Sequence, residues 1–125
     1  MKKIFIGTIT AWSLLFSAIG YAQDTKPHGY MIANYDIKDQ VGFQKYMDAA
    51  GTLAPKYHGT VTVFNLNATA VEGHPRSVIA IAEFPSLADA QRFYNSPEYT
   101  AAKKFRIAST EGSVILTEGF MPQKP

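Results

Sequence analysis

Residues 77–84 read Ser-Val-Ile-Ala-Ile-Ala-Glu-Phe, and Pro85 ends the run. The segment is rich in β-branched residues and nearly continuous in apolar character, which is typical of a strand buried on both faces. Such a strand needs other structure above and below it, so the flanking segments are expected to supply the elements that cover it.

A helix is predicted on the N-terminal side of this strand. Asp39 is a favourable cap residue, and it precedes apolar residues that recur at helical spacing. Those residues are Phe43, Tyr46, Met47, Ala50 and Leu53. Pro55 and Gly59 bracket the end of this helix.

Two more helices are predicted after Pro85. Ser86 can cap the first, with Asp89 three residues later as in a capping box. Its inner face comprises Leu87, Ala90, Phe93 and Tyr94. Residues 96–98, Ser-Pro-Glu, begin the second helix, because serine caps, proline suits the first turn and glutamate complements the helix dipole. This helix is expected to run to about Ala108 and to be broken by Gly112.

Three more strands complete the pattern, at residues 29–37, 60–66 and 113–121, and residues 68–72 extend or pair with the second of them. The order strand, helix, strand, strand, helix pair, strand is that of the ferredoxin-like β-α-β-β-α-β fold. We therefore expect one α+β domain with a four-stranded antiparallel sheet and its helices on one face.

The other face of this sheet would be bare in a single chain. Because the strand within 77–84 carries apolar side chains on both faces, the bare face is expected to be apolar, and such a surface usually marks an interface. We therefore expect a homodimer packed sheet to sheet. The alternative is an alternating sheet with a half-solvated outer face.

Residues 1–22 have the pattern of a secretory signal peptide. Two lysines at positions 2 and 3 precede an uncharged, mostly apolar run over residues 4–19, and Gly20-Tyr21-Ala22 provides a small-x-small cleavage site. We expect cleavage after Ala22 and a periplasmic or secreted protein; the alternative is a transmembrane anchor. The mature chain would comprise a polar leader at 23–28, the domain at 29–121 and a tail at 122–125.

Composition excludes several classes of function. The 125 residues include no cysteine, so disulfides, thiolate catalysis, Fe–S clusters and cysteine zinc sites are excluded. The formal charge is +2, and loss of Lys2 and Lys3 with the signal leaves a formally neutral chain, which argues against nucleic acid and membrane surfaces as partners. His28, His58 and His74 lack metal-ligand spacing, so no metal and no cofactor are expected.

Several segments resemble a known family. Residues 72–79 (Glu-Gly-His-Pro-Arg-Ser-Val-Ile), 83–86 (Glu-Phe-Pro-Ser), 93–99 (Phe-Tyr-Asn-Ser-Pro-Glu-Tyr) and Arg106 are similar to the bacterial domain of unknown function 1330. That family belongs to the dimeric α/β-barrel superfamily, so the resemblance implies this fold and a dimer for residues 30–119. It implies no activity, because the superfamily includes monooxygenases, haem-degrading enzymes, isomerases and binding proteins. Phe93 stands where members often carry tryptophan, and this chain would be an exported member.

Glu83 and Arg106 are the first pair of candidate site residues. An ionised carboxylate in an apolar strand needs a partner, and Arg106 on the last helix is the candidate partner. The pair would either fix helix to sheet or anchor an anionic ligand.

Other polar residues have two interpretations each. Asn34 and Asp36 share one face of the first strand, where they line a cavity or mark a solvated end. Tyr94 and Tyr99 flank the junction of the last two helices, where they pack or help to hold an anion. His58 is either an exposed loop histidine or a functional residue, since it lies at the start of a predicted strand.

Three functions remain open from the sequence. In the first, the protein binds a small organic molecule, acidic or aromatic, between helices and sheet. Arg106, Glu83, Asn34, Tyr94 and Tyr99 would be its ligand-binding residues, with Tyr30 and Phe64 as further walls. In the second, it is a cofactor-free enzyme of monooxygenase or isomerase type, with Glu83, Asp36 or His58 as acid or base. In the third, it is an interaction dimer without a site.

Overall fold

The computed structural model describes residues 26–125 and Gly7. The predicted signal peptide at 1–22, Gly7 apart, and the first part of the leader lie outside the described residues. Within the described part of the chain, none of the helices has the length and apolar character needed to span a bilayer.

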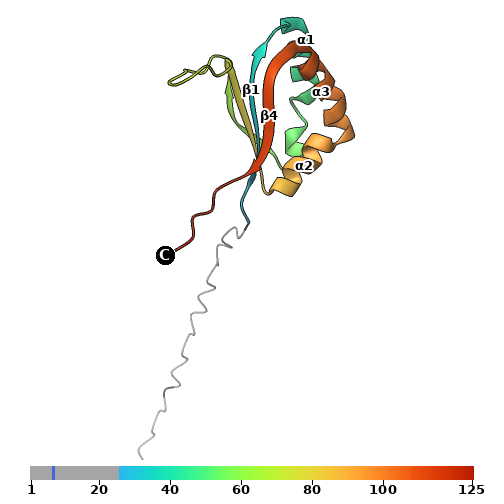
Figure 1. Cartoon of the computed structure of the whole chain (residues 1–125). Helices are drawn as coiled ribbons and strands as arrows, with labels where there is room; N and C mark the ends of the chain where they lie inside the picture. Colours follow the sequence, from blue (N-terminus) through green and yellow to red (C-terminus); the bar gives the residue numbers. More distant parts are fainter. Residues whose placement is uncertain (1–6, 8–25) are drawn as a thin grey trace, which may run out of the picture.

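The described elements follow the predicted order (Figure 1). They are β1 (Gly29–Ile37), α1 (Gln40–Ala50), η1 (Ala54–Tyr57), β2 (Thr60–Asn65), β3 (Val78–Phe84), α2 (Leu87–Asn95), α3 (Pro97–Ser109) and β4 (Thr110–Glu118). The short 3-10 helix η1 was not predicted as a separate element. Residues 68–72 form no strand, and β4 begins three residues earlier than expected.

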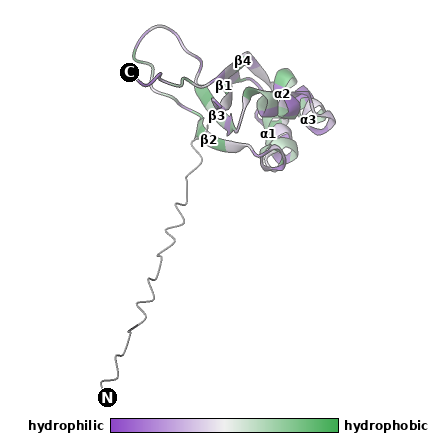
Figure 2. Cartoon of the chain, turned by 90° about the horizontal axis from the view of Figure 1, so that it is seen from below, coloured by the Kyte–Doolittle hydropathy of each residue, from purple (hydrophilic) through white to green (hydrophobic). Residues whose placement is uncertain are grey.

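The four strands form one antiparallel sheet in the order β2-β3-β1-β4. All three α-helices lie on one side of it, as Figure 2 shows from below. The predicted ferredoxin-like α+β fold is therefore confirmed.

Side-chain caps set the helix starts. Asp39 accepts a hydrogen bond from the Val41 amide at 3.1 Å, and the Ser86 hydroxyl accepts one from the Asp89 amide at 3.1 Å. Ser96 ends α2 and also caps α3. The three predicted caps are confirmed. Because Ser96 both ends α2 and caps α3, the two helices meet at this one residue.

Gly112 does not break a helix. It lies inside β4 opposite Tyr35, and a Cβ atom built at Gly112 would lie 2.3 Å from the carbonyl oxygen of Asn34. Helix α3 already ends at Ser109, so the glycine allows the close approach of two strands rather than ending the helix.

An aromatic cluster holds the helices on the sheet. The Phe93 ring on α2 lies 5.2 Å from Phe84 on β3 and 4.4 Å from Tyr99 on α3, measured between ring centroids. All three side chains are buried. This cluster ties together one strand and two helices, so it forms the centre of the core.

The sheet face away from the helices, called here the open face, carries a row of apolar residues. Strand register aligns one residue from each strand, in the order Val63, Ile81, Ile32 and Ile115. Val63 is 37% and Ile115 is 54% exposed in the single chain. The predicted apolar character therefore holds for this row, with Glu83 on one side of it and Asn34 on the other.

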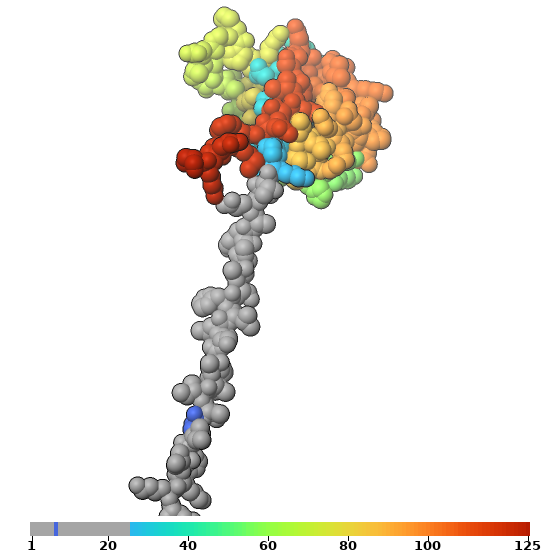
Figure 3. All heavy atoms as spheres, turned by 60° about the horizontal axis from the view of Figure 1, so that its bottom comes forward, coloured from blue at the N-terminus to red at the C-terminus, as the bar shows by residue number. Residues whose placement is uncertain are grey.

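Two segments project from the domain. Residues 66–77, called here the arm, connect β2 to β3 and stand away from the sheet, and residues 119–125 form a tail beyond β4 (Figure 3). Val71 in the arm and Phe120 in the tail are 91% and 89% exposed, so neither belongs to the core.

Candidate functional site

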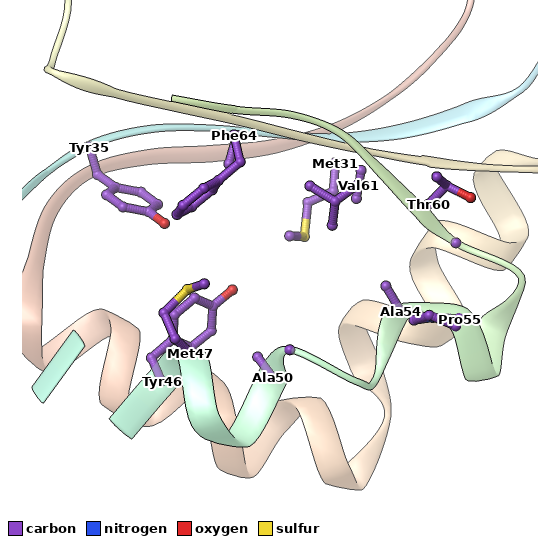
Figure 4. A pocket seen from close by; sticks show the side chains of 14 residues that line it. Met31, Tyr35, Tyr46, Met47, Ala50, Ala54, Pro55, Thr60, Val61 and Phe64 are labelled. Carbon is purple, nitrogen blue, oxygen red and sulfur yellow. The ribbon is translucent and has the colours of Figure 1, made fainter. Parts of the chain in front are cut away.

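A cavity of about 570 Å³ lies between α1 and η1 on one side and β1, β2 and β3 on the other (Figure 4). It is lined by Met31, Tyr35, Tyr46, Met47, Ala50, Gly51, Ala54, Pro55, Gly59, Thr60, Val61, Phe64, Ala80 and Ala82. Small residues on α1, η1 and β3 leave the space open, because their side chains are too short to fill the gap between helix and sheet.

The cavity opens beside the edge strand β2. Val61 and Phe64 belong to the lining and are 58% and 45% exposed. β2 has only one neighbouring strand, so this side of the domain is uncovered in the single chain. A small molecule has a direct route from solvent into the space beneath α1.

The inner end of the cavity is polar. Figure 4 shows the Tyr35 and Tyr46 hydroxyls directed toward the hollow from the sheet and from α1. Among residues 26–125, no aspartate, glutamate or histidine lines the cavity. Burial raises the pKa of Tyr35 to about 12, and burial with the neighbouring Tyr99 raises the pKa of Tyr46 as well. Both phenols are therefore protonated at neutral pH.

A buried arginine lies behind these tyrosines. Arg106 on α3 is only 6% exposed, and its guanidinium carbon lies 5.9 Å from the centroid of the Tyr46 ring. The Tyr46 and Tyr99 hydroxyl oxygens are 2.9 Å apart. Arg106 takes part in none of the ion pairs among residues 26–125, and its Nε atom has no hydrogen-bond partner.

The predicted Glu83–Arg106 pair is wrong. Glu83 lies on the open face, where its Oε1 atom accepts from His28 Nδ1 at 2.6 Å and from the Tyr30 hydroxyl at 3.0 Å. Arg106 lies beneath the helices, so the sheet separates the two. The bonds from His28 and Tyr30 hold the pKa of Glu83 below its ordinary value, and the carboxylate needs no arginine.

A second cleft, of about 440 Å³, surrounds this carboxylate. It is lined by His28, His58, Thr60, Glu83, Phe84 and Pro85. The structure thus brings together Glu83 and His58, two of the three residues predicted as acid or base. Among the described residues no group of three histidine or acidic side chains is arranged to hold a metal ion.

Comparison with known proteins identifies the family. Residues 28–120 match the domain of unknown function called DUF1330. The chain belongs to this family. No curated protein matches it.

Solved structures share the fold of this DUF1330 domain at low sequence identity. A protein of unknown function from Rhodopseudomonas palustris is 20% identical, with a TM-score of 0.59 over 78% of this chain and 85% of that chain. A Bacteroides fragilis protein, described as dimeric and ferredoxin-like, is 18% identical, with a TM-score of 0.51 over 74% and 96%. The hydroxynitrile lyase from Passiflora edulis is also 18% identical, with a TM-score of 0.53 over 79% and 98%. These similarities show the fold.

Asn34 and Asp36 in the DUF1330 domain lie on the open face and do not line the cavity. The Asp36 carboxylate accepts from Arg76 at 2.8 Å and from the Ser77 amide and hydroxyl at 3.0 Å. Asn34 bonds the backbone of Arg76 and Val78. The arginine and Ser77 bonds lower the pKa of Asp36 to about 2, so this cluster anchors the end of the arm.

Tyr94 and Tyr99 do not line the cavity either. Tyr94 is half-buried beneath the Lys103 ammonium, which lies 3.9 Å from its ring centroid. Tyr99 is fully buried, and its amide donates to the Ser96 hydroxyl, so it is not available to an anion. Arg106, also predicted to bind ligand, does not line the cavity, and both it and Tyr99 lie next to the lining residue Tyr46.

Sequence reasoning assigned Tyr46 to the core face of α1 and passed over Tyr35. The alternation of Met31, Ala33 and Tyr35 along β1 carried the signal for Tyr35, because every second residue faces the helices. Phe64 alone among the predicted apolar walls lines the cavity; Tyr30 faces the other way.

Proposed function

We propose that this protein binds a small, largely apolar organic molecule in the cavity beneath α1. The observation that carries the proposal is the cavity itself, whose volume of about 570 Å³ lies within the range of small-molecule sites. Its wall is apolar except for the inner tyrosine hydroxyls and Thr60. That combination provides a hydrophobic driving force together with a few groups that orient the ligand.

Binding fits this cavity better than catalysis. General acid–base catalysis needs a group that titrates near neutral pH, and the two tyrosines have raised pKa values. The lining contains no other group of that kind. An interaction dimer without a site would not need a hollow of this size between helix and sheet, because these layers normally pack closely.

We also propose a homodimer that acts outside the cytoplasm after cleavage at Ala22. The apolar row on the open face supports the dimer, since a second copy would remove it from water. The Bacteroides fragilis protein of the same fold is described as dimeric. The amino-acid pattern of residues 1–22 supports export.

Replacing Ala50 with phenylalanine tests the binding site. Ala50 lines the cavity from α1, so the larger ring should occupy the ligand's space and weaken binding of the neutral fluorophore N-phenyl-1-naphthylamine by at least about tenfold. Ala49 on the same helix is exposed, which makes Ala49→Phe the matched control. Fluorescence titration of both variants and the parent protein gives the affinities. Equal affinities for all three proteins would place the fluorophore elsewhere and contradict the proposal.

A second candidate function is proton transfer at the cleft around Glu83. The Glu83 carboxylate accepts from His28 Nδ1 at 2.6 Å, an arrangement that would orient the imidazole ring in the cleft. His58 lies in the same cleft. The Passiflora edulis protein shows that a lyase occurs with this fold.

Glu83→Gln tests this second candidate. If the cleft abstracts protons, the parent protein should exchange the α-hydrogen of an aryl ketone for deuterium, as followed by NMR. Loss of the carboxylate should slow this exchange by at least about a hundredfold. Glu72 in the arm is exposed, so Glu72→Gln should leave the rate unchanged. No exchange above buffer in the parent protein, or an unchanged rate in Glu83→Gln, would exclude this function.

A further inference from the structure

Arg106 is a cation in the core without a counter-ion among the described residues. It is 6% exposed, its Nε atom is unpartnered, and it takes part in none of the ion pairs. Burial acts to lower the pKa of Arg106, but interactions with neighbouring tyrosines, Tyr99 first, outweigh it and raise that pKa. The guanidinium is therefore charged, although a buried charge normally has a compensating partner.

The donor and acceptor groups of the cluster limit the directions in which its protons can be given. An arginine side chain only donates, so the Tyr99 hydroxyl cannot give its proton to Arg106. The Tyr46 oxygen lies 2.9 Å away, and either hydroxyl can donate in this pair; when Tyr99 is the donor, its proton is directed to the Tyr46 oxygen. The Tyr46 proton is then left for the cavity, toward which this hydroxyl points (Figure 4).

The positive charge strengthens this chain of donors. Hydrogen bonds in series polarise one another, and a guanidinium at the start makes the last hydroxyl a stronger donor than it would be without that charge. Tyr35 presents a second hydroxyl to the same end of the cavity, and it is protonated at neutral pH because burial raises its pKa. The described part of the chain provides no carboxylate or histidine in the cavity lining to balance the charge.

We propose that the ligand is an apolar, aromatic-sized molecule with one negatively charged oxygen group, such as a carboxylate, and that this group lies against the Tyr46 and Tyr35 hydroxyls. The charged oxygen would accept from both hydroxyls and offset the charge of Arg106 through Tyr99 and Tyr46. The ring system would fill the apolar part beneath Met47 and Ala50. This inference rests on the proposed binding function and adds the chemical class of ligand.

Two probes that differ mainly in charge test the inference. In isothermal titration at pH 7, the parent protein should bind 2-naphthoate at least tenfold more tightly than the neutral 2-naphthamide. Tyr46→Phe removes the last donor, so it should abolish most of this preference while 2-naphthamide still binds. Arg106→Met should have the same effect, provided that circular dichroism shows the variant to be folded. Arg106 is a positioning residue that acts through Tyr46, so its loss should change the ratio of the two affinities rather than lower both equally.

Tyr57→Phe is the matched control. Tyr57 packs against Phe93 at 5.9 Å between ring centroids and does not line the cavity, so the preference for naphthoate should remain. Equal affinity of the parent protein for both probes, with both lost in Ala50→Phe, would overturn the anion inference and leave the binding site standing. A preference that survives in Tyr46→Phe would also overturn it. Failure of both probes to bind, or binding that Ala50→Phe does not change, would overturn the binding site as well.

Discussion

Ile81→Glu is expected to convert the proposed homodimer into monomers. Ile81 lies in the middle of the open face, paired with Ile32 on one side and Val63 on the other. In a sheet-to-sheet dimer the substitution would place a carboxylate from each copy inside an apolar interface, where an ionised group has no partner. We expect the dissociation constant to rise at least about a thousandfold, equivalent to about 4 kcal/mol.

Sedimentation equilibrium over a range of protein concentrations measures this effect. Ile107→Glu is the matched control, because Ile107 on α3 is 61% exposed on the helix side of the domain and its substitution should leave the dimer intact. Circular dichroism of both variants reports whether the domain remains folded. A parent protein that is monomeric at micromolar concentration, or an Ile81→Glu variant that dimerises normally, would contradict the proposed interface.

Phe93→Ala should produce the largest loss of stability among single core substitutions. The Phe93 side chain is 3% exposed and contacts the rings of Phe84, Tyr99 and Tyr57, so its removal leaves a cavity where α2, α3 and β3 meet. Substitutions of this kind cost about 3–5 kcal/mol. A domain of this size is typically stable by only about 5–15 kcal/mol, so the variant would be close to unfolding at room temperature.

Urea unfolding followed by far-ultraviolet circular dichroism measures the change. The control is Phe120→Ala, because Phe120 in the tail is 89% exposed. All proteins must be compared at one concentration, since a dimer couples stability to concentration. A loss below about 1 kcal/mol for Phe93→Ala would mean that the aromatic cluster is not the centre of the core.

Much of the fold could be predicted from local signals. The three caps are short-range features in which a side chain bonds an amide two or three residues away, so Asp39, Ser86 and Ser96 indicate the helix starts directly. The four-stranded antiparallel sheet with its helices on one face followed from the element order. The error at Gly112 arose because glycine permits both a helix end and a close strand contact, and only the position of Asn34 on the neighbouring strand distinguishes the two.

The candidate site was harder to predict because it depends on which face each strand turns to the helices. Glu83 was expected to pair with Arg106, because an ionised carboxylate in an apolar strand needs a partner. Strand alternation instead places Glu83 on the open face, beside His28 and Tyr30, which lie more than fifty residues away in the chain. No local pattern contains that information.

The cavity itself also lacks a signature in the sequence. It exists because Ala50, Ala80 and Ala82 come together from different elements, and each alanine alone is an ordinary core residue. The role of Tyr46 likewise depends on its contact with Tyr99, from a helix fifty-three residues later. Such sites emerge from packing rather than from spacing along the chain.

A crystal structure of the protein with 2-naphthoate tests most directly whether the space beneath α1 is a binding site. The proposed site predicts density for the two rings beside Met47, Ala50 and Ala82, with the carboxylate within hydrogen-bond distance of the Tyr46 hydroxyl. A cavity filled by the protein's own Phe64 and Met47 side chains, with the naphthoate on the open face or absent, would contradict it.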